Sequence, residues 1–397
     1  MCHRTFGGLQ TSALSQAMAA LKDALSQAMG EMNASWFVVE PATHDAIIVA
    51  AFKQRGFDDD EARAAARCCR QATFLGNRTH NALKALDVDE HLGSVVGGCA
   101  PATRWTVLES RFKACERWDA RRCSGFLVAE AAMDRACELA EAYGTGCVAV
   151  DNAFHYLFGA HYVLRASAKG YIAYTTCTGA VPEVVPTGGT RKAMGTNPQT
   201  YALPTTNALG FDVCIDWATS VISNGTVKAL AREGKRCPEG AIFDKDGRPT
   251  TDPNEFHAHA CVGGHKGYSL CLLTELLAAF GGGSLPSARS KVGGGDGGDK
   301  RTCNFLFQAW HPDALAPASL SANVATVDEN VKAVVADILG PGNEGARLPG
   351  QGKREAALRS ARANGLLFSR AEVDALARIA ARSGVAFDPG ACARYAE

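Results

Sequence analysis

The chain has 397 residues, 47% of them hydrophobic and 21% charged, which is the composition of a globular protein with room for two or three domains. Its 41 basic and 41 acidic residues cancel without a basic block, which argues against nucleic acid or an anionic membrane surface as a partner. No apolar run reaches the roughly 18–20 residues that span a bilayer, and the 15 cysteines are irregularly spaced, so we expect reduced thiols and a cytoplasmic location.

The amino-terminal segment contains a short repeat. "ALSQAM" occurs at 13–18 and again at 24–29, and eleven residues are close to three helical turns, so both copies fall on one helix face. We therefore expect residues 1–35 to form a helical extension that lies on the surface or in an oligomer contact. An organelle import signal is the alternative, but Asp23 and Glu31 disfavour it because transit peptides are poor in acidic residues.

Helical periodicity dominates both ends of the remaining chain. Residues 41–90 place apolar groups at three- and four-residue steps, and the acidic cluster 58–61 is typical of a helix N-terminus. A further helix is predicted over 126–143, ending at Gly144, and residues 326–397 return to helical patterns.

The middle of the chain predicts strands. "GCVAVDNAF", "GYIAYTTCT", "FDVCIDWATS" and "CNFLFQAW" are short, apolar and rich in β-branched or aromatic residues, and 178–267 is punctuated by glycine and proline. We expect an α+β protein with a helical domain made of 36–120 and 326–397 and an α+β domain made of 121–325.

Three glycine-rich stretches differ in what they indicate. Gly293, Gly295 and Gly298 satisfy G-x-G-x-x-G but lie in a loop-like tract, so we do not expect a Rossmann nucleotide site there. "GGHKGYSLCLLTELLAAF" places His265 and Lys266 where an apolar helix begins, which suits a phosphate or carboxylate, although a merely solvated lysine explains it equally well.

A second segment also suits an anion. "GGTRKAMGTNPQTYALP" supplies cations followed by the polar groups of Thr196 and Asn197, and a plain turn is the alternative.

Two histidines and one acid are candidate catalytic groups. His80 lies in a helical stretch, His155 follows a predicted strand, and Asp216 lies in a mostly apolar strand, where a carboxylate needs a partner such as a histidine. "HAHAC" at 257–261 could offer zinc ligands, but the spacing matches no structural zinc pattern, so we expect no metal.

Taken in order, these segments resemble the malate/L-lactate dehydrogenase family, which is distinct from the Rossmann-fold dehydrogenases. The resemblance runs from about residue 40 to residue 390. It is carried by five motifs in order, which are "RCSGFLVAEAAMDRACELAEAYGTGCVAVDNAFHYLFGAHYVLRASAKGYIAY", "GTNP", "IDWATS", "GGHKGYSL" and "RLPGQ".

The resemblance implies a cofactor domain built on a largely antiparallel mixed sheet, packed on a helical domain from both chain ends, in a homodimer. It implies NAD or NADP as cofactor and a small 2-oxo or 2-hydroxy acid as substrate. His80 falls on the proton donor, Asp216 on its paired acid and His155 on a second pocket histidine. The implied cofactor contacts are Thr196, Asn197, Asp212, Ile215, Ala218, His265, Lys266, Gly350, Gln351 and Gly352.

Two departures from the family pattern concern the substrate. The family's S-H-G reads Thr79-His80-Asn81 here, and the arginine four residues beyond the histidine is Lys84, which cannot grip a carboxylate with two prongs. With His155, we expect Thr79, Lys84 and Arg78 to bind the substrate.

The expected reaction is reversible hydride transfer between the nicotinamide and C2 of the acid, with His80 supplying the proton and Asp216 raising its pKa. Two alternatives remain, namely reduction of a cyclic imine acid and a catalytically silent nucleotide-binding homologue. A zinc-dependent hydrolase is a remote third.

Overall fold

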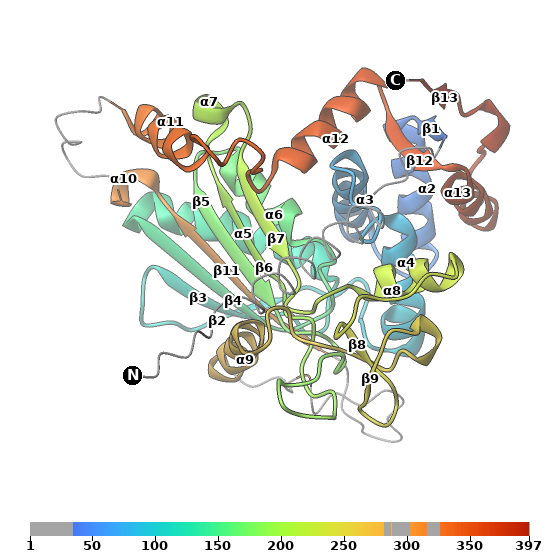
Figure 1. Cartoon of the computed structure of the whole chain (residues 1–397), viewed down its shortest axis with the longest axis horizontal. Coiled ribbons are helices and arrows are strands. Elements are labelled where there is room, and N and C mark those ends of the chain that lie inside the picture. The colour runs from blue at the N-terminus through green and yellow to red at the C-terminus, as the bar shows by residue number, and fades with distance from the viewer. Residues whose placement is uncertain (1–34, 282–286, 288–301, 316–325, 397) are drawn as a thin grey trace, which may run out of the picture.

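The computed structural model describes residues 35–281, 287, 302–315 and 326–396 (Figure 1). The expected extension over 1–35, apart from its last residue, and the glycine tract 293–298 lie outside the described residues.

A seven-stranded sheet organises the larger part of the molecule. Its strands, in spatial order, are β2 (Thr106–Leu108), β3 (Cys115–Asp119), β4 (Thr145–Ala153), β11 (Cys303–Trp310), β5 (Ile172–Cys177), β6 (Gln199–Leu203) and β7 (Val213–Trp217). All neighbouring pairs are antiparallel except β3 and β4, which run parallel. The prediction of a largely antiparallel mixed sheet is confirmed.

Helices cover both faces of this sheet. Successive residues of a strand point to opposite faces, and in β6 the side chain of Gln199 bonds Thr274 of α9 (His265–Phe280), while Thr200 lies against Gly159 of α6 (Gly159–Ser167). α5 (Gly125–Tyr143) packs beside α6 on β4 and β11 and ends, as predicted, at Gly144 with a left-handed φ of +80°. The sheet is therefore a middle layer.

The two ends of the described chain meet in a small sheet of order β12-β1-β13. β1 (Trp36–Val39) is its central strand and pairs antiparallel with β12 (Leu366–Ser369) and β13 (Arg394–Tyr395). The helices around it are α2 (Pro41–Lys53), α3 (Asp59–Phe74), α4 (Ala82–Leu92), α12 (Gln351–Arg362) and α13 (Arg370–Arg382). The expected helical part formed by both chain ends is confirmed (Figure 1).

Local sequence explains the start of α3. Asp58 accepts a hydrogen bond from the Glu61 N–H, and the Glu61 side chain accepts one from the Asp58 N–H, which is a complete capping box. The acidic cluster is thus a helix start, as its position in the sequence predicted.

The remaining elements are short or peripheral. They are α7 (Thr206–Leu209), α8 (Asn224–Arg232), α10 (Pro312–Leu315), α11 (Val327–Ile338), the strands β8 (Ile242–Phe243), β9 (Pro249–Thr250) and β10 (Ala258–His259), and 3₁₀ turns at Ser94–Val96, Pro253–Glu255 and Pro389–Ala391. β10, β8 and β9 form a third small sheet near the carboxyl end of β7.

Candidate active site

His80 lies in the tight turn that leads into α4. The Asn77 carboxamide oxygen accepts the His80 N–H at 3.1 Å, and the His80 Nδ1 atom is 2.9 Å from the Thr79 hydroxyl. The ring is half-buried, and its Nε2 atom has no hydrogen-bond partner within the described part of the chain. One ring nitrogen is therefore held and the other is open to a reactant.

Asp216 lies on β7, the edge strand of the large sheet. Thr200 is its directly opposed residue on β6 and donates its hydroxyl to Asp216 Oδ1 at 3.0 Å. The other oxygen, Oδ2, is 3.6 Å from the ammonium of Lys353, which belongs to α12. A carboxylate this deeply placed (13% exposed) is thus paired on both oxygens.

His80 and Asp216 are close enough for their charges to act on each other, although they are far apart in the sequence. The Asp216 charge raises the pKa of His80, as the sequence predicted, but the net effect is the opposite. Burial is the largest cause and lowers the pKa of His80, and Lys84 and Lys353 lower it further. The expectation of a raised pKa is wrong for the protein without ligands, because burial and two cations outweigh one carboxylate.

His155 joins the same group from the end of β4. Its Nδ1 atom accepts the Leu157 N–H at 2.9 Å. Burial, with smaller contributions from Lys84 and His80, lowers the pKa of His155 to about 3. A small pocket beside it is lined mainly by Phe52, Phe57, Phe126, Phe154 and Leu157.

Lys84 is the cation common to both histidines. It lies on α4, where its ammonium is 3.4 Å from Asp87, and its charge acts on His80, His155 and Glu183. An ammonium whose charge acts on two imidazoles of lowered pKa suits the binding of a carboxylate, and the imidazoles suit the transfer of a proton.

Glu183 is a carboxylate that sequence reasoning did not single out. Asn224 donates its amide to Glu183 Oε1 at 2.5 Å, and the adjacent Gly225 lies against the side chain of Thr79. Burial raises the pKa of Glu183, and Lys84 and Asn224 only partly oppose the rise. An acid therefore borders the site opposite its lysine.

Arg78 points elsewhere. Its guanidinium bonds Glu372 and Ser369 at the start of α13 and lies 4.8 Å above the ring of Trp36. Its expected role in binding substrate stays a prediction that these contacts do not support.

The expected cofactor residues of α12 lie against β7. The Cys214 N–H donates to the Pro349 carbonyl at 3.2 Å, and a Cβ atom on Gly350 would come within 2.8 Å of the Asp212 carbonyl oxygen. Gly350 has a φ of +104° and caps α12, which starts at Gln351. The close approach of helix and strand therefore requires glycine here, and Gly352 faces open space.

The start of α9 carries the other expected cations. Gly263 and Gly264 have φ values of +61° and +62°, and α9 begins at His265, followed by Lys266. Both side chains are exposed, and Ser220, just beyond Ala218 and the end of β7, bridges to Cys261, just before the helix. The free N–H groups of this first turn, an ammonium and two unobstructed glycines suit a phosphate.

Asn197 connects α9 to the loop that follows β5. It is fully buried with a φ of +33°; its oxygen accepts the Gly179 N–H, and its amide donates to the Cys271 carbonyl and to Glu275 on α9. The neighbouring Thr196 offers its carbonyl to Thr219. Asn197 thereby holds α9 against the sheet. Thr196, Asn197 and, on β7, Ile215 remain predicted cofactor contacts.

Three site residues escaped the sequence analysis, namely Lys353, Thr200 and Glu183. Lys353 directly follows a glycine pair at a helix start, the same signal that marked Lys266, so it could have been found. Thr200 needs the β6–β7 register and Glu183 needs the fold, so neither carried a signal.

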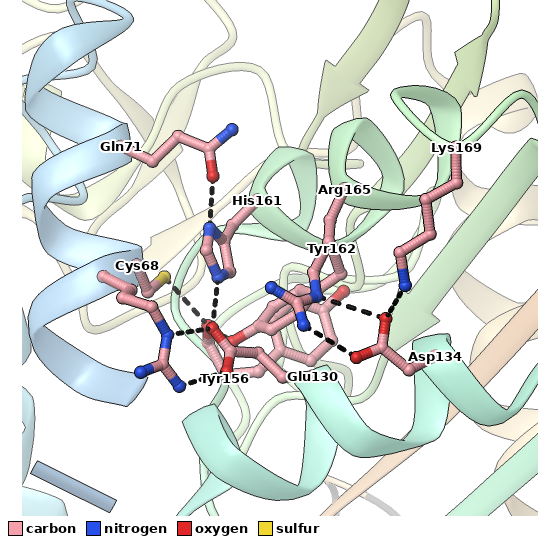
Figure 2. A network of polar contacts seen from close by, with 10 residues as sticks. Cys68, Gln71, Glu130, Asp134, Tyr156, His161, Tyr162, Arg165 and Lys169 are labelled. Atoms are coloured by element: carbon pink, nitrogen blue, oxygen red, sulfur yellow. Dashed lines mark hydrogen bonds and ion pairs between the residues drawn. The ribbon is translucent and has the colours of Figure 1, made fainter. Parts of the chain in front are cut away.

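A second histidine–acid pair lies in the core between α3, α5 and α6 (Figure 2). His161 Nε2 is 2.8 Å from Glu130, which also receives two hydrogen bonds from Arg67, and His161 Nδ1 contacts Gln71. Burial alone would raise the pKa of Glu130, but hydrogen bonds from His161 and Arg67 lower it to about 2. Both ring nitrogens of His161 and both carboxylate oxygens of Glu130 are therefore already engaged by side chains of the core.

Neither a metal site nor a membrane-spanning helix is present among residues 35–281, 287, 302–315 and 326–396. No group of three His, Cys, Asp or Glu side chains there is arranged to hold a metal ion. His259 is fully buried, and burial followed by Lys192 lowers its pKa to about 4. None of these described helices has the length and apolarity to cross a bilayer.

The largely antiparallel sheet and the match to a family model together make the protein an oxidoreductase outside the Rossmann class. The chain belongs to the malate/L-lactate dehydrogenase family, whose family model matches residues 39–377.

The relatives of this chain include a 2-hydroxy-acid dehydrogenase and reductases of cyclic imine acids. The chain is 27% identical to malate/(S)-sulfolactate dehydrogenase of Methanothermus fervidus over 312 residues, covering 77% of this chain and 89% of that one. It is 30% identical to delta(1)-pyrroline-2-carboxylate reductase of Ancylobacter novellus over 314 residues, covering 78% and 88%. The solved delta1-piperideine-2-carboxylate reductase of Pseudomonas syringae superposes with a TM-score of 0.73 at 26% identity, covering 86% and 99%.

Proposed function

We propose that the protein is an NAD- or NADP-dependent dehydrogenase that interconverts a small 2-hydroxy acid and its 2-oxo acid. The observation that carries the proposal is that His80, Asp216, Lys84 and His155 lie close enough for their charges to interact, although they come from the turn before α4, from β7, from α4 and from beyond the end of β4. Family membership supports the same reaction class.

The chain's own residues would perform the proton chemistry. Lys84 pairs with the substrate carboxylate and places C2 beside His80. In reduction, His80 Nε2 delivers a proton to the oxygen that becomes negative; in oxidation, the same atom accepts the hydroxyl proton. Proton transfer of this kind typically contributes ~10²–10⁴-fold to the rate.

The cofactor would lie along β7 between the two helix starts. Lys266 and the first N–H groups of α9 would hold its phosphates, while Asp212, Ile215 and Ala218 on and after β7 would line it. The start of α12, Gly350 to Gly352, would close the other side. When bound, the nicotinamide supplies or accepts the hydride.

Reduction of a cyclic imine acid is the second candidate. Two of the relatives described above carry that activity in their names. Glu183 favours it as well, because a half-buried carboxylate near Lys84 could accept a hydrogen bond from a protonated imine nitrogen. The catalytically silent homologue is disfavoured, since a silent site has no need of His80, Asp216 and Lys266 together.

A substrate panel tests the proposal. Pyruvate, oxaloacetate, a hydroxylated 2-oxo acid and piperideine-2-carboxylate are each supplied with NADH and with NADPH, and cofactor absorbance is followed. Turnover of at least one 2-oxo acid, abolished in His80→Asn, supports the dehydrogenase. Turnover of the imine alone selects the second candidate, and cofactor binding without turnover of any compound refutes both.

We also propose a cytoplasmic homodimer with no nucleic-acid or membrane partner, in which residues 36–120 with 326–397 and residues 121–325 form the two domains. The dimer is supported by an exposed apolar stripe on one face of α9, made of Leu272, Leu273, Leu276 and Phe280. Light scattering should give twice the 41.7 kDa chain mass, and Leu276→Glu should lower it. A monomeric wild-type protein contradicts the proposal.

A further inference from the structure

Lys353 occupies an unusual place for a cation. It is the third residue of α12, whose cap is Gly350, and its side chain is 24% exposed. Helix N-termini favour acidic side chains because the helix dipole is positive there, so a lysine in the first turn is unfavourable by itself. The Asp216 carboxylate, 3.6 Å away, is the compensating partner.

This contact decides what Asp216 can do. Thr200 donates a hydrogen bond to Asp216 Oδ1, and Lys353 forms an ion pair with Asp216 Oδ2. The Nδ1 atom of His80 bonds the Thr79 hydroxyl and not Asp216. Asp216 therefore acts on His80 through its charge and not through a hydrogen bond.

The charged and titratable groups around His80 come from four elements. They are Lys84 from α4, Asp216 from β7, Lys353 from α12 and His155 from the end of β4. Asp216 is the anion of this set, and its charge favours the protonated form of His80. Lys353 is the cation that pairs with Asp216.

We propose that Lys353 is a positioning residue that holds the Asp216 carboxylate and so keeps it from forming a hydrogen bond with His80. Without such a bond, the imidazolium form of His80 is less favoured. A neutral ring with an open Nε2 atom accepts a proton. Where the proposed function holds, this prepares the enzyme for oxidation, in which the hydroxyl proton passes to His80, the C2 hydride passes to the nicotinamide, and the 2-oxo acid is formed.

The test is the titration of the His80 ring in ligand-free protein. Histidine labelled with ¹³C is followed by NMR, and His80→Asn assigns the signal. Lys353→Met should raise the His80 midpoint by on the order of one pH unit, because the freed carboxylate then favours imidazolium. Lys353→Gln, a second variant that keeps a polar side chain at this half-buried position, should do the same.

Two controls isolate the role. Lys353→Arg keeps the cation and should leave the midpoint near wild type. Arg354→Met removes the neighbouring cation of the same helix, which faces Phe211, and should also leave it unchanged. An unshifted midpoint in both Lys353→Met and Lys353→Gln overturns the proposal, as does an Arg variant that shifts as much as Met.

A double-mutant cycle tests the route through Asp216. In an Asp216→Asn background, Lys353→Met should shift the His80 midpoint clearly less than it does alone. The direct effect of the Lys353 charge on His80 should leave a small residual shift in that background. A shift as large as in the wild-type background would mean that the whole effect of Lys353 is direct, and the positioning role would be lost. Because the titration needs no turnover, its outcome is independent of whether a 2-oxo acid proves to be the substrate.

Discussion

Two histidine–carboxylate pairs in this protein show how differently the same residue types can be used. His161 and Glu130 are buried between three helices, and their polar atoms are taken up by Arg67, Gln71 and each other (Figure 2). His80 and Asp216 do not bond each other, and one nitrogen of His80 is open. In the core pair every polar side-chain atom already forms a hydrogen bond, whereas in the site pair one nitrogen of His80 can still form one.

The contrast teaches that proton chemistry needs an incomplete network. A buried carboxylate with all its bonds made is fixed in one protonation state over a wide pH range, as Glu130 is. His80 stands between one carboxylate and two lysines, so a small change in the surrounding charge can alter its protonation state. We therefore expect mutations of His80 or Asp216 to lower activity, and mutations of His161 or Glu130 to lower stability.

The largest expected effect is on catalysis. His80→Asn should reduce kcat for the 2-oxo acid by ~10²–10⁴-fold while changing the melting temperature little, because the ring makes one side-chain hydrogen bond at a half-buried position. Steady-state kinetics and a thermal melt check both parts. Near wild-type turnover would remove His80 from the mechanism.

The core pair should give the opposite result. Glu130→Ala leaves the buried His161 ring without its hydrogen-bond partner and the partly exposed Arg67 guanidinium without its carboxylate, and an unpaired buried polar group costs about 1–3 kcal/mol of unfolding free energy. Urea unfolding measures the loss. Activity per folded molecule should stay close to wild type. A large loss of kcat in the folded fraction would contradict a purely structural role for Glu130.

The pH dependence of stability should reveal Glu130 as well. Its pKa is about 2 in the folded protein against 4.5 normally, so its contribution is complete above about pH 4.5 and is lost as the pH falls toward 2. The lowered pKa corresponds to roughly 3 kcal/mol across that window. Glu130→Gln should flatten the stability curve between pH 4.5 and 2; an unchanged slope would contradict the assignment.

The smallest expected effect concerns the support of Asp216. Thr200→Val removes one hydrogen bond from a carboxylate that keeps Lys353, so we expect about 1 kcal/mol, or about fivefold in kcat/KM. Thr175→Val, on the adjacent strand β5, is a matched control, because its buried hydroxyl has no hydrogen-bond partner among the described residues. Equal effects of the two changes would deny Thr200 a specific role.

The sequence predicted the fold class well, for physical reasons that can be named. Helical periodicity and the Asp58–Glu61 capping box fixed α3, and the apolar run "CNFLFQAW" fixed β11. The resemblance to the family led to His80 and Asp216, because motif order survives where spacing alone is uninformative.

The remaining features depend on three-dimensional register. Thr200 meets Asp216 through strand pairing, and Lys353 reaches it only because Gly350 lets α12 approach β7. The net direction of the His80 pKa was missed because burial and cations from distant segments cannot be summed from a linear pattern. His161 gave no sequence signal that distinguished it from a catalytic histidine.

The small sheet that joins the chain ends has a consequence for biosynthesis. β1 is complete near residue 39, yet its partners begin at residues 366 and 394. On the ribosome, the early helices must wait for almost the whole polypeptide before their sheet can form, which is a contact of very long range and slow closure. Until then Trp36 and Phe37 lack their strand partners, so two large apolar side chains stay exposed on the growing chain.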